Sequence, residues 1–372
     1  MLGRPRRLAI LAEGQFTRLD AKTAVGVLRY RPAEVAAIVD STRAGRLAAD
    51  CVGAGGDVPV VASLEEAAAR GADSLMIGIA PIGGTLPDAW RTVVRGALER
   101  GWDVLSGLHS FLGDDPEFAA LARRTGAALH DVRRPSRPLA VAAARAARLD
   151  ACVVLTVGTD CNVGKMTTGL EVRRVLEARG VGAGFVATGQ TGIFIADHGV
   201  AVDAVPSDFA AGAIETCVLE AAAAADVVIV EGQGALHHPG FSGVTLSLLH
   251  GAAPAAMILC HEITRGLIRR SAERGAAIDV PPLAAVRDAY EQAAAWIAPA
   301  RVIGVALQTA DLDEPAARAA IEAAARETGL PATDPVRFGA GPLADAVLAA
   351  QRERVAARGA ASAAGRSRAA AT

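Results

Sequence analysis

The chain has 372 residues, of which 52% are hydrophobic and only 3% aromatic, and its formal net charge is −2. This length favours two domains, and the near-neutral charge argues against a nucleic-acid or membrane-surface partner. Five cysteines without CxxC spacing argue against a secreted disulfide framework, and no apolar stretch reaches transmembrane length. We therefore expect a cytoplasmic protein. We also expect a homo-oligomer with a small-molecule amino-acid substrate.

The N-terminal half alternates short apolar runs with helical patterns. This alternation predicts a parallel sheet covered by helices on both faces, which is a Rossmann-like α/β domain. Asp40 ends the second apolar run, where an acid binds ribose in dinucleotide sites. No GxGxxG follows the first run, so we interpret Asp40 as a turn or helix cap. The expected strands are 7–12, 35–39, 58–62, 74–78 and 102–105, and the expected helices are 21–27, 64–70 and 90–100.

Composition changes at two places along the chain. Residues 133–138 are polar, charged and Pro-rich, which is typical of a linker. They predict a Rossmann-like domain over 1–140 and a second α/β domain over 141–352. The last stretch, 353–372, is mostly Ala, Arg, Ser and Gly, and it predicts a disordered tail.

The second domain is predicted to open on a phosphate-binding P-loop. Residues 153–157 read VVLTV, as a buried strand does, and a helical pattern begins at Met166. Between them, glycines let backbone amides approach phosphate oxygens, and Lys165 adds a full positive charge. The residues predicted to contact a nucleotide or phosphate here are Gly158, Thr159, Asn162, Val163, Gly164, Lys165, Met166 and Thr167.

This P-loop departs from the usual pattern in two ways. Five residues separate its two glycines where four are usual, and Met166 replaces the Ser or Thr that holds Mg²⁺. A thioether is a poor Mg²⁺ ligand, so either Thr167 takes this role or the metal site is changed. Glu231 ends a second buried strand, 226–230, and offers a hard oxygen in a Walker-B arrangement. We predict Thr167 and Glu231 as the metal ligands of the P-loop domain.

Other polar residues follow neighbouring strands. Residues 188–192 read TGQTG and predict a second Gly-rich loop. Adjacent His237 and His238 suggest zinc, but neighbouring side chains diverge and no third ligand has suitable spacing, so acid–base or substrate contact is preferred. The predicted catalytic residues are Lys165, Glu231 and Asp160, and the predicted substrate contacts are Gln190, Thr191, Asp208 and His237.

Two resemblances follow from these motifs. Residues 158–165 resemble the P-loop of dethiobiotin synthetases, which use ATP to activate a carboxylate or carbamate for capture by an amine. Through 158–168, 188–192 and 231–235, nearly the whole chain resembles the DgcN-like family, long filed as a domain of unknown function. That resemblance implies a Rossmann-like N-terminal domain, a P-loop C-terminal domain and D-glutamate N-acetyltransferase activity. Related P-loop proteins also imply that Gln308 contacts the adenine edge.

Three functions are compatible with these motifs. Acetyl transfer implies acetyl-CoA, whose phosphates would occupy the loop. The P-loop itself favours ATP and Mg²⁺ in an amide ligase that works through an acyl phosphate, with charge stabilised by Lys165 and by Mg²⁺ near Glu231. A nucleotide-binding sensor without turnover is the third hypothesis. For the enzyme hypotheses we expect the substrate between the P-loop face and the N-terminal domain, because clefts at domain interfaces are favoured sites.

Overall fold

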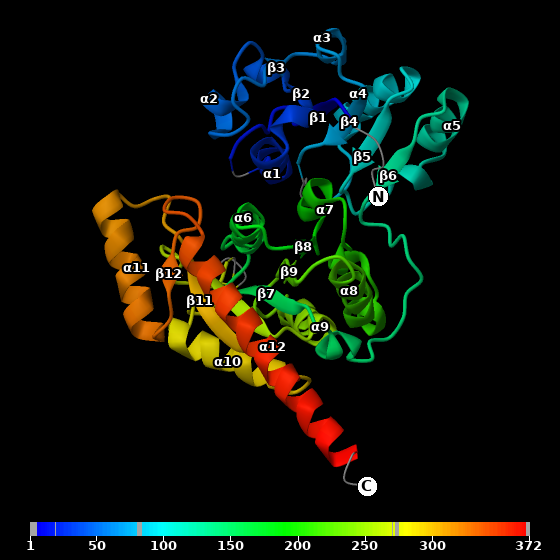
Figure 1. Cartoon of the computed structure of the whole chain (residues 1–372). Helices are drawn as coiled ribbons and strands as arrows, with labels where there is room; N and C mark the ends of the chain where they lie inside the picture. The colour runs from blue at the N-terminus through cyan, green and yellow to red at the C-terminus, as the bar shows by residue number, and fades with distance from the viewer. Residues whose placement is uncertain (1–5, 19, 80–83, 270, 272–274, 370–372) are drawn as a thin grey trace. The chain divides into compact units, whose positions relative to one another are not determined.

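Two parallel sheets of six strands each organise the chain, and each belongs to its own unit (Figure 1). The first unit comprises Met1–Pro138 and Gly189–Ala204, and the second comprises Leu139–Thr188 and Val205–Thr372. The computed structural model describes residues 6–18, 20–79, 84–269, 271 and 275–369, with backbone alone for 359–369. No helix in these ranges is both long and apolar enough to cross a bilayer.

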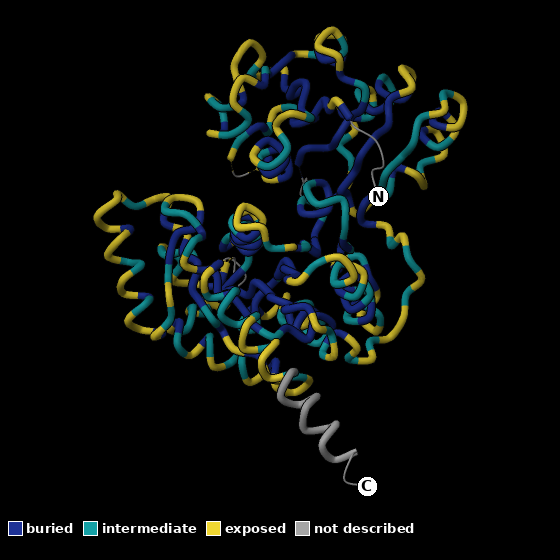
Figure 2. The backbone as a smooth tube through the Cα atoms, in the orientation of Figure 1, coloured by how far each residue is buried: buried dark blue, intermediate teal, exposed yellow. Residues whose placement is uncertain are grey.

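The first unit has the strand order β3-β2-β1-β4-β5-β6, which confirms the predicted Rossmann-like domain. All four residues of its first strand, LAIL, are buried (Figure 2). The strands are β1 (Leu8–Leu11), β2 (Val35–Val39), β3 (Val60–Val61), β4 (Ser74–Ile77), β5 (Asp103–Ser106) and β6 (Leu129–Asp131). The α-helices are α1 (Lys22–Tyr30), α2 (Ala48–Val52), α3 (Leu64–Ala69), α4 (Asp88–Glu99), α5 (Pro116–Thr125) and α7 (Gln190–Ala196).

Asp40 caps a turn, as the sequence predicts. Its fully buried carboxylate accepts hydrogen bonds from the backbone N–H of Thr42, at the start of the short 3-10 helix Ser41–Arg43. It also accepts from the backbone N–H groups of Gly14 and Phe16, so it fixes the loop that follows β1. A carboxylate engaged by this many donors serves the fold of the loop.

Residues 188–192 are not a Gly-rich loop throughout, which corrects the sequence-based expectation. Gln190 begins α7, and the segment 189–204 belongs to the first unit although it lies far along the chain. There α7 packs against α1, and the hydroxyls of Thr23 and Thr191 lie 2.9 Å apart. Buried Ile193 and Phe194 supply the packing that a short helix needs.

The second unit has the strand order β12-β11-β10-β7-β9-β8. The P-loop strand β7 is buried along its whole length and lies between β9 and β10. Its strands are β7 (Cys152–Gly158), β8 (Ala183–Val186), β9 (Val227–Val230), β10 (Ala256–Glu262), β11 (Arg301–Gln308) and β12 (Ala332–Thr333). Its α-helices are α6 (Lys165–Ala178), α8 (Ser207–Ala222), α9 (Ser242–Ala252), α10 (Leu283–Ala295), α11 (Glu314–Thr328) and α12 (Gly341–Ala369).

Helices cover the second sheet in two groups. The helices α6 and α12 pack together, and α8, α9, α10 and α11 pack in succession. The stretch before β7 lies against α8, where the fully buried carboxylate of Glu215 accepts from the backbone N–H of Arg145 at 2.6 Å and binds its side chain. This stretch, 139–145, is called the strap below.

The predicted disordered tail differs from the structure, which continues α12 to Ala369. Ala and Arg, which dominate the tail, are strong helix formers. Two tail arginines are also anchored, because Arg354 donates to the carbonyl of Leu149 at 2.7 Å and Arg358 pairs with Asp150. Residues 370–372 lie outside the described part of the chain.

Candidate phosphate site of the second unit

The P-loop joins β7 to α6, as the sequence predicts. Two of its residues have left-handed backbone, Asn162 with φ of 58° and Gly164 with φ of 95°. Gly164 is the N-cap of α6, so the turn ends with backbone amides at a helix N-terminus, where anions are stabilised. Gly158 is needed for close packing, because a Cβ there would lie 2.8 Å from the Val163 side chain.

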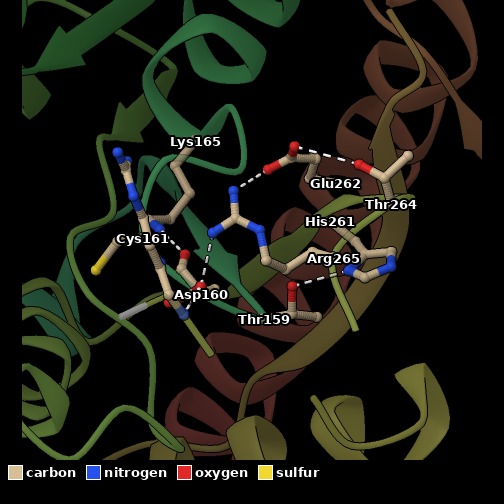
Figure 3. A network of polar contacts seen from close by, with 9 residues as sticks. Thr159, Asp160, Cys161, Lys165, His261, Glu262, Thr264 and Arg265 are labelled. Atoms are coloured by element: carbon tan, nitrogen blue, oxygen red, sulfur yellow. Dashed lines mark hydrogen bonds and ion pairs between the residues drawn. The ribbon is translucent and has the colours of Figure 1, made fainter. Parts of the chain in front are cut away.

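Lys165 lies within this turn beside Asp160 and Cys161 (Figure 3). It is buried and only 7% exposed. Its Nζ donates to the backbone carbonyl of Asp160 at 2.7 Å, which folds the side chain back onto the loop. Burial lowers the pKa of Lys165, and the acid Glu231 is among the groups that oppose this shift. A desolvated cation so placed interacts strongly with an incoming phosphate.

Asp160 holds the loop in place and is fully buried (Figure 3). Its carboxylate accepts from the guanidinium of Arg265 at 2.9 Å, from the backbone N–H of Arg269 at 2.7 Å and from the backbone N–H of Cys161 at 2.7 Å. Arg265 also pairs with Glu262 at the end of β10. These contacts give Asp160 a positioning role, and its predicted catalytic role remains a prediction.

Neighbouring strands fix the beginning of the loop. The hydroxyl of Thr159 lies 2.9 Å from Nδ1 of His261, on β10, and burial lowers the pKa of this histidine. The buried hydroxyl of Tyr290, on α10, donates to the carbonyl of Gly158 at 2.8 Å and accepts from the N–H of Leu236 at 3.3 Å. Burial raises the pKa of this phenol well above its ordinary value, so it stays protonated. The P-loop and the segment after β9 are thereby joined.

Glu231 lies at the end of β9, next to the P-loop strand. Its Oε2 accepts from the backbone N–H of Thr188 at 3.0 Å, and its Oε1 accepts from the Gln233 amide at 3.1 Å. The following Gly232 approaches the P-loop, because a Cβ there would lie 1.7 Å from the Thr156 carbonyl oxygen and 3.0 Å from Cδ of Lys165. The segment that carries the acid therefore lies against Lys165, and the Walker-B role of Glu231 as a metal ligand remains a prediction.

The P-loop fold implies Mg²⁺ beside the phosphates, but the side chains at this site suit it poorly. Met166 offers sulfur where an oxygen ligand is usual, and each carboxylate oxygen of Glu231 already accepts a hydrogen bond. Thr167 is half-buried and remains the predicted hydroxyl ligand. The positive charges of Lys165 and Arg265 add repulsion for a cation.

His238 joins the loop in a way that sequence spacing does not reveal. One donor atom from each of Asp160, Cys161 and His238 lies within 4.8 Å of the others. Arg265 already neutralises Asp160, so this cluster is better suited to positioning than to holding a cation. His237 is half-buried, and its Nδ1 is buried without a hydrogen-bond partner among the described residues. Burial lowers the pKa of His237.

The remaining predicted residues lie outside the P-loop segment, on other elements. Gln308 is exposed at the end of β11, two strands from β7, and Asp208 is exposed in the first turn of α8. Gln190 and Thr191 belong to the first unit, where Gln190 lies against Gly107 after β5. Their predicted substrate contacts remain predictions.

Sequence reasoning missed the residues that hold the loop. Arg265 and Arg269 lie in an irregular segment without a motif, and Tyr290 lies in the middle of a helix. One available signal was the strand end Cys260-His261-Glu262, because the carboxyl ends of adjacent parallel strands meet at one edge of a sheet. That rule would have placed the segment after β10 beside the P-loop.

Comparison with known proteins identifies the family. Residues 140–344 match the model described as "Domain of unknown function (DUF1611_C) P-loop domain", and residues 41–135 match the DUF1611_N Rossmann-like domain. The chain belongs to the DUF1611 family. A crystal structure of a DUF1611 family protein from Anabaena variabilis is 40% identical, with a TM-score of 0.87 over 92% of this chain and 99% of that one.

Two curated relatives of this DUF1611 chain carry the name D-glutamate N-acetyltransferase. The protein from Tritonibacter scottomollicae is 42% identical over 332 residues, covering 89% of this chain and 95% of its own length. The protein from Pseudoalteromonas sp. is 35% identical over 282 residues, covering 74% of this chain and 82% of its own length. Both are acyltransferases by name, so this chain is a member of an enzyme family.

Proposed function

We propose that this protein transfers an acetyl group to the amino group of D-glutamate. The observation that carries the proposal is the 42% identity to a D-glutamate N-acetyltransferase across both units, P-loop domain included. Fold alone would not support it, since P-loop folds host many reactions. The buried Lys165 in its amide-lined turn adds a place for the phosphates of an acyl donor.

Acetyl-CoA is the proposed donor, and it would supply the acetyl group already activated as a thioester. The amides of 158–165 and the Lys165 ammonium then bind phosphate oxygens, while Asp160 and Tyr290 keep the turn in shape. Binding of this kind orients the donor and costs little reorganisation, because the loop is held from several sides.

His237 is the proposed base that takes a proton from the substrate amine as its nitrogen bonds to the acetyl carbon. The thioester C–S bond breaks in the same transfer, and CoA leaves as the thiol with that proton. The Nδ1 of His237 has no partner among the described residues, and the lowered pKa of His237 keeps the ring neutral at neutral pH. A neutral imidazole with a free nitrogen is suited to accept a proton.

An ATP-dependent amide ligase is the second candidate. It is favoured by Lys165 and Glu231, which follow the adjacent strands β7 and β9. Such a ligase needs Mg²⁺ to neutralise the transferring phosphoryl group. Met166 at the metal position weakens this candidate relative to acetyl transfer.

The test is an assay of purified protein with D-glutamate and either acetyl-CoA or acetate plus ATP. We expect CoA thiol release and N-acetyl-D-glutamate, detected by mass spectrometry, with acetyl-CoA only. L-glutamate is the control for stereochemistry. Release of ADP in place of CoA would support the ligase. If neither ADP nor CoA is released and no product forms with either donor, the result would support a sensor protein.

A further inference from the structure

The side chains around the P-loop disagree with a Mg²⁺-dependent phosphate site. Met166 removes one oxygen ligand, and the carboxylate of Glu231 is hydrogen-bonded to Thr188 and Gln233. A bound diphosphate still carries several negative charges that must be neutralised. Another positive group at the loop has to do this if the metal does not.

The segment that follows β10 brings such a group to the loop. The backbone N–H of Arg269 donates to Asp160 at 2.7 Å, so the residue is attached to the P-loop by its main chain. Its side chain is exposed, and no residue in the described part of the chain accepts a hydrogen bond from it. By contrast, Arg265 is already paired with both Asp160 and Glu262.

The positive charge of Arg269 acts electrostatically on the P-loop turn. Burial raises the pKa of the Cys161 thiol, and the positive charges of Lys165, Arg269 and Arg265 each oppose this rise. The guanidinium is always charged and matches two phosphate oxygens with its planar fork. Arg269 therefore has the position, the charge and the free donors to bind a phosphate beside Lys165.

We propose that Arg269 binds the diphosphate of the acyl donor at the P-loop and takes the place of Mg²⁺. This inference rests on the proposed function for the identity of the donor, CoA, and on the described contacts for the site itself. It predicts a phosphate site that works without metal, in which Arg269 and Lys165 share the ligand's charge.

The experiment is calorimetric titration of the full chain with CoA, and separately with ADP, in Mg²⁺ and in EDTA. We expect equal affinity for CoA in both buffers. Arg269→Ala should lower that affinity by about 10- to 100-fold, since hydrogen bonds to charged groups contribute at that level. The CoA affinity of Arg269→Lys should lie between those of the wild type and Arg269→Ala, because lysine keeps the charge but lacks the planar guanidinium.

Folding of the variants is not at risk from the substitution itself. The contact of residue 269 with Asp160 uses the backbone N–H, which alanine retains. The matched control is Arg326→Ala, which removes an exposed arginine on α11, far from the loop in the chain. We expect the CoA affinity of this variant to equal that of the wild type. Met166→Thr restores the usual hydroxyl and should make binding stronger in Mg²⁺ than in EDTA.

The outcomes separate this inference from the proposed function. Binding that requires Mg²⁺ in the wild type, unaltered affinity in Arg269→Ala, or no binding of either probe would each overturn the inference. If ADP binds without metal and depends on Arg269 while CoA does not bind, the metal-free site stands and acetyl-CoA as donor fails. Metal-free CoA binding that depends on Arg269 supports both.

Discussion

At the scale of single residues, the buried Lys165 determines what the P-loop can bind. Lys165→Met keeps the length of the side chain and removes the charge that faces phosphate. We expect kcat/KM to fall by about 100-fold or more, as when a preorganised electrostatic donor is removed. The free energy of unfolding should be unchanged or higher, because a desolvated charge is lost.

The control for this variant is the chain's other lysine, Lys22, which is exposed on α1. Lys22→Met should leave kcat/KM near the wild-type value. Equal activity in Lys165→Met and wild type would contradict the assignment of the loop as a phosphate site. Steady-state kinetics and urea denaturation together provide both readouts.

The pKa of His237 determines how kcat/KM is expected to change at acid pH. Burial lowers its pKa below the ordinary 6.5. The ring therefore stays neutral until the pH falls to this lowered pKa. We expect kcat/KM to fall at acid pH as the proposed base becomes protonated, and His237→Gln to lose about 100-fold at neutral pH. A variant with wild-type rate and the same acid limb would rule this base out.

The same lowered pKa bears on stability. In the pH range between the lowered folded value and 6.5, the unfolded chain binds more protons at this position than the folded chain. The neutral His237 therefore makes its full contribution to the free energy of unfolding above about pH 6.5. This contribution is lost as the pH falls through the lowered pKa of His237 in the folded chain. His237→Gln should lose less unfolding free energy than wild type between neutral and mildly acid pH.

At the scale of elements, the strap 139–145 depends on a glycine in α8. A Cβ at Gly212 would lie 1.8 Å from the carbonyl oxygen of Ala140, so Gly212→Ala forces the strap off the helix. We expect a loss of about 1–3 kcal/mol in the free energy of unfolding, which is typical of overpacking. Urea denaturation measures this difference.

Gly243, in α9, is the matched control because its Cβ would meet nothing within 4 Å. Alanine there should stabilise the chain by about 0.4–1 kcal/mol through the unfolded state. If both alanine variants behave alike, the close approach of the strap to α8 is not what determines stability there.

Short sequence patterns were enough to predict most strands, the P-loop and the acid after β9. Most strands of both sheets have apolar runs, whereas β6 reads LHD and gives no such signal. The P-loop and Glu231 are recognisable because phosphate chemistry requires those residue types in order. The helix α7 was missed because Thr-Gly-Gln-Thr-Gly resembles a turn, and its helical form depends on packing against α1. Arg265 and Arg269 were missed because their role depends on Asp160, about a hundred residues earlier in the chain.

At the scale of the whole molecule, neither unit is a continuous stretch of chain. The segment Gly189–Ala204 completes the first unit, where Arg133 pairs with Asp203 and Arg31 donates to Asp197 at 2.9 Å. A fragment of residues 1–138 lacks these partners and should be less soluble than the same fragment extended through a flexible linker by 189–204. Size-exclusion chromatography and circular dichroism of the two fragments test this, and equal behaviour would contradict it.

This interleaved connection also limits how the protein can change over generations. A recombination event that exchanged the first 138 codons would bring a foreign sheet to a helix shaped for the original one. Substitutions at Thr23, Gly107 or Arg133 should therefore be inherited together with compensating substitutions at Thr191, Gln190 or Asp203. The two halves of the gene are expected to share one ancestry, even though their products fold around separate sheets.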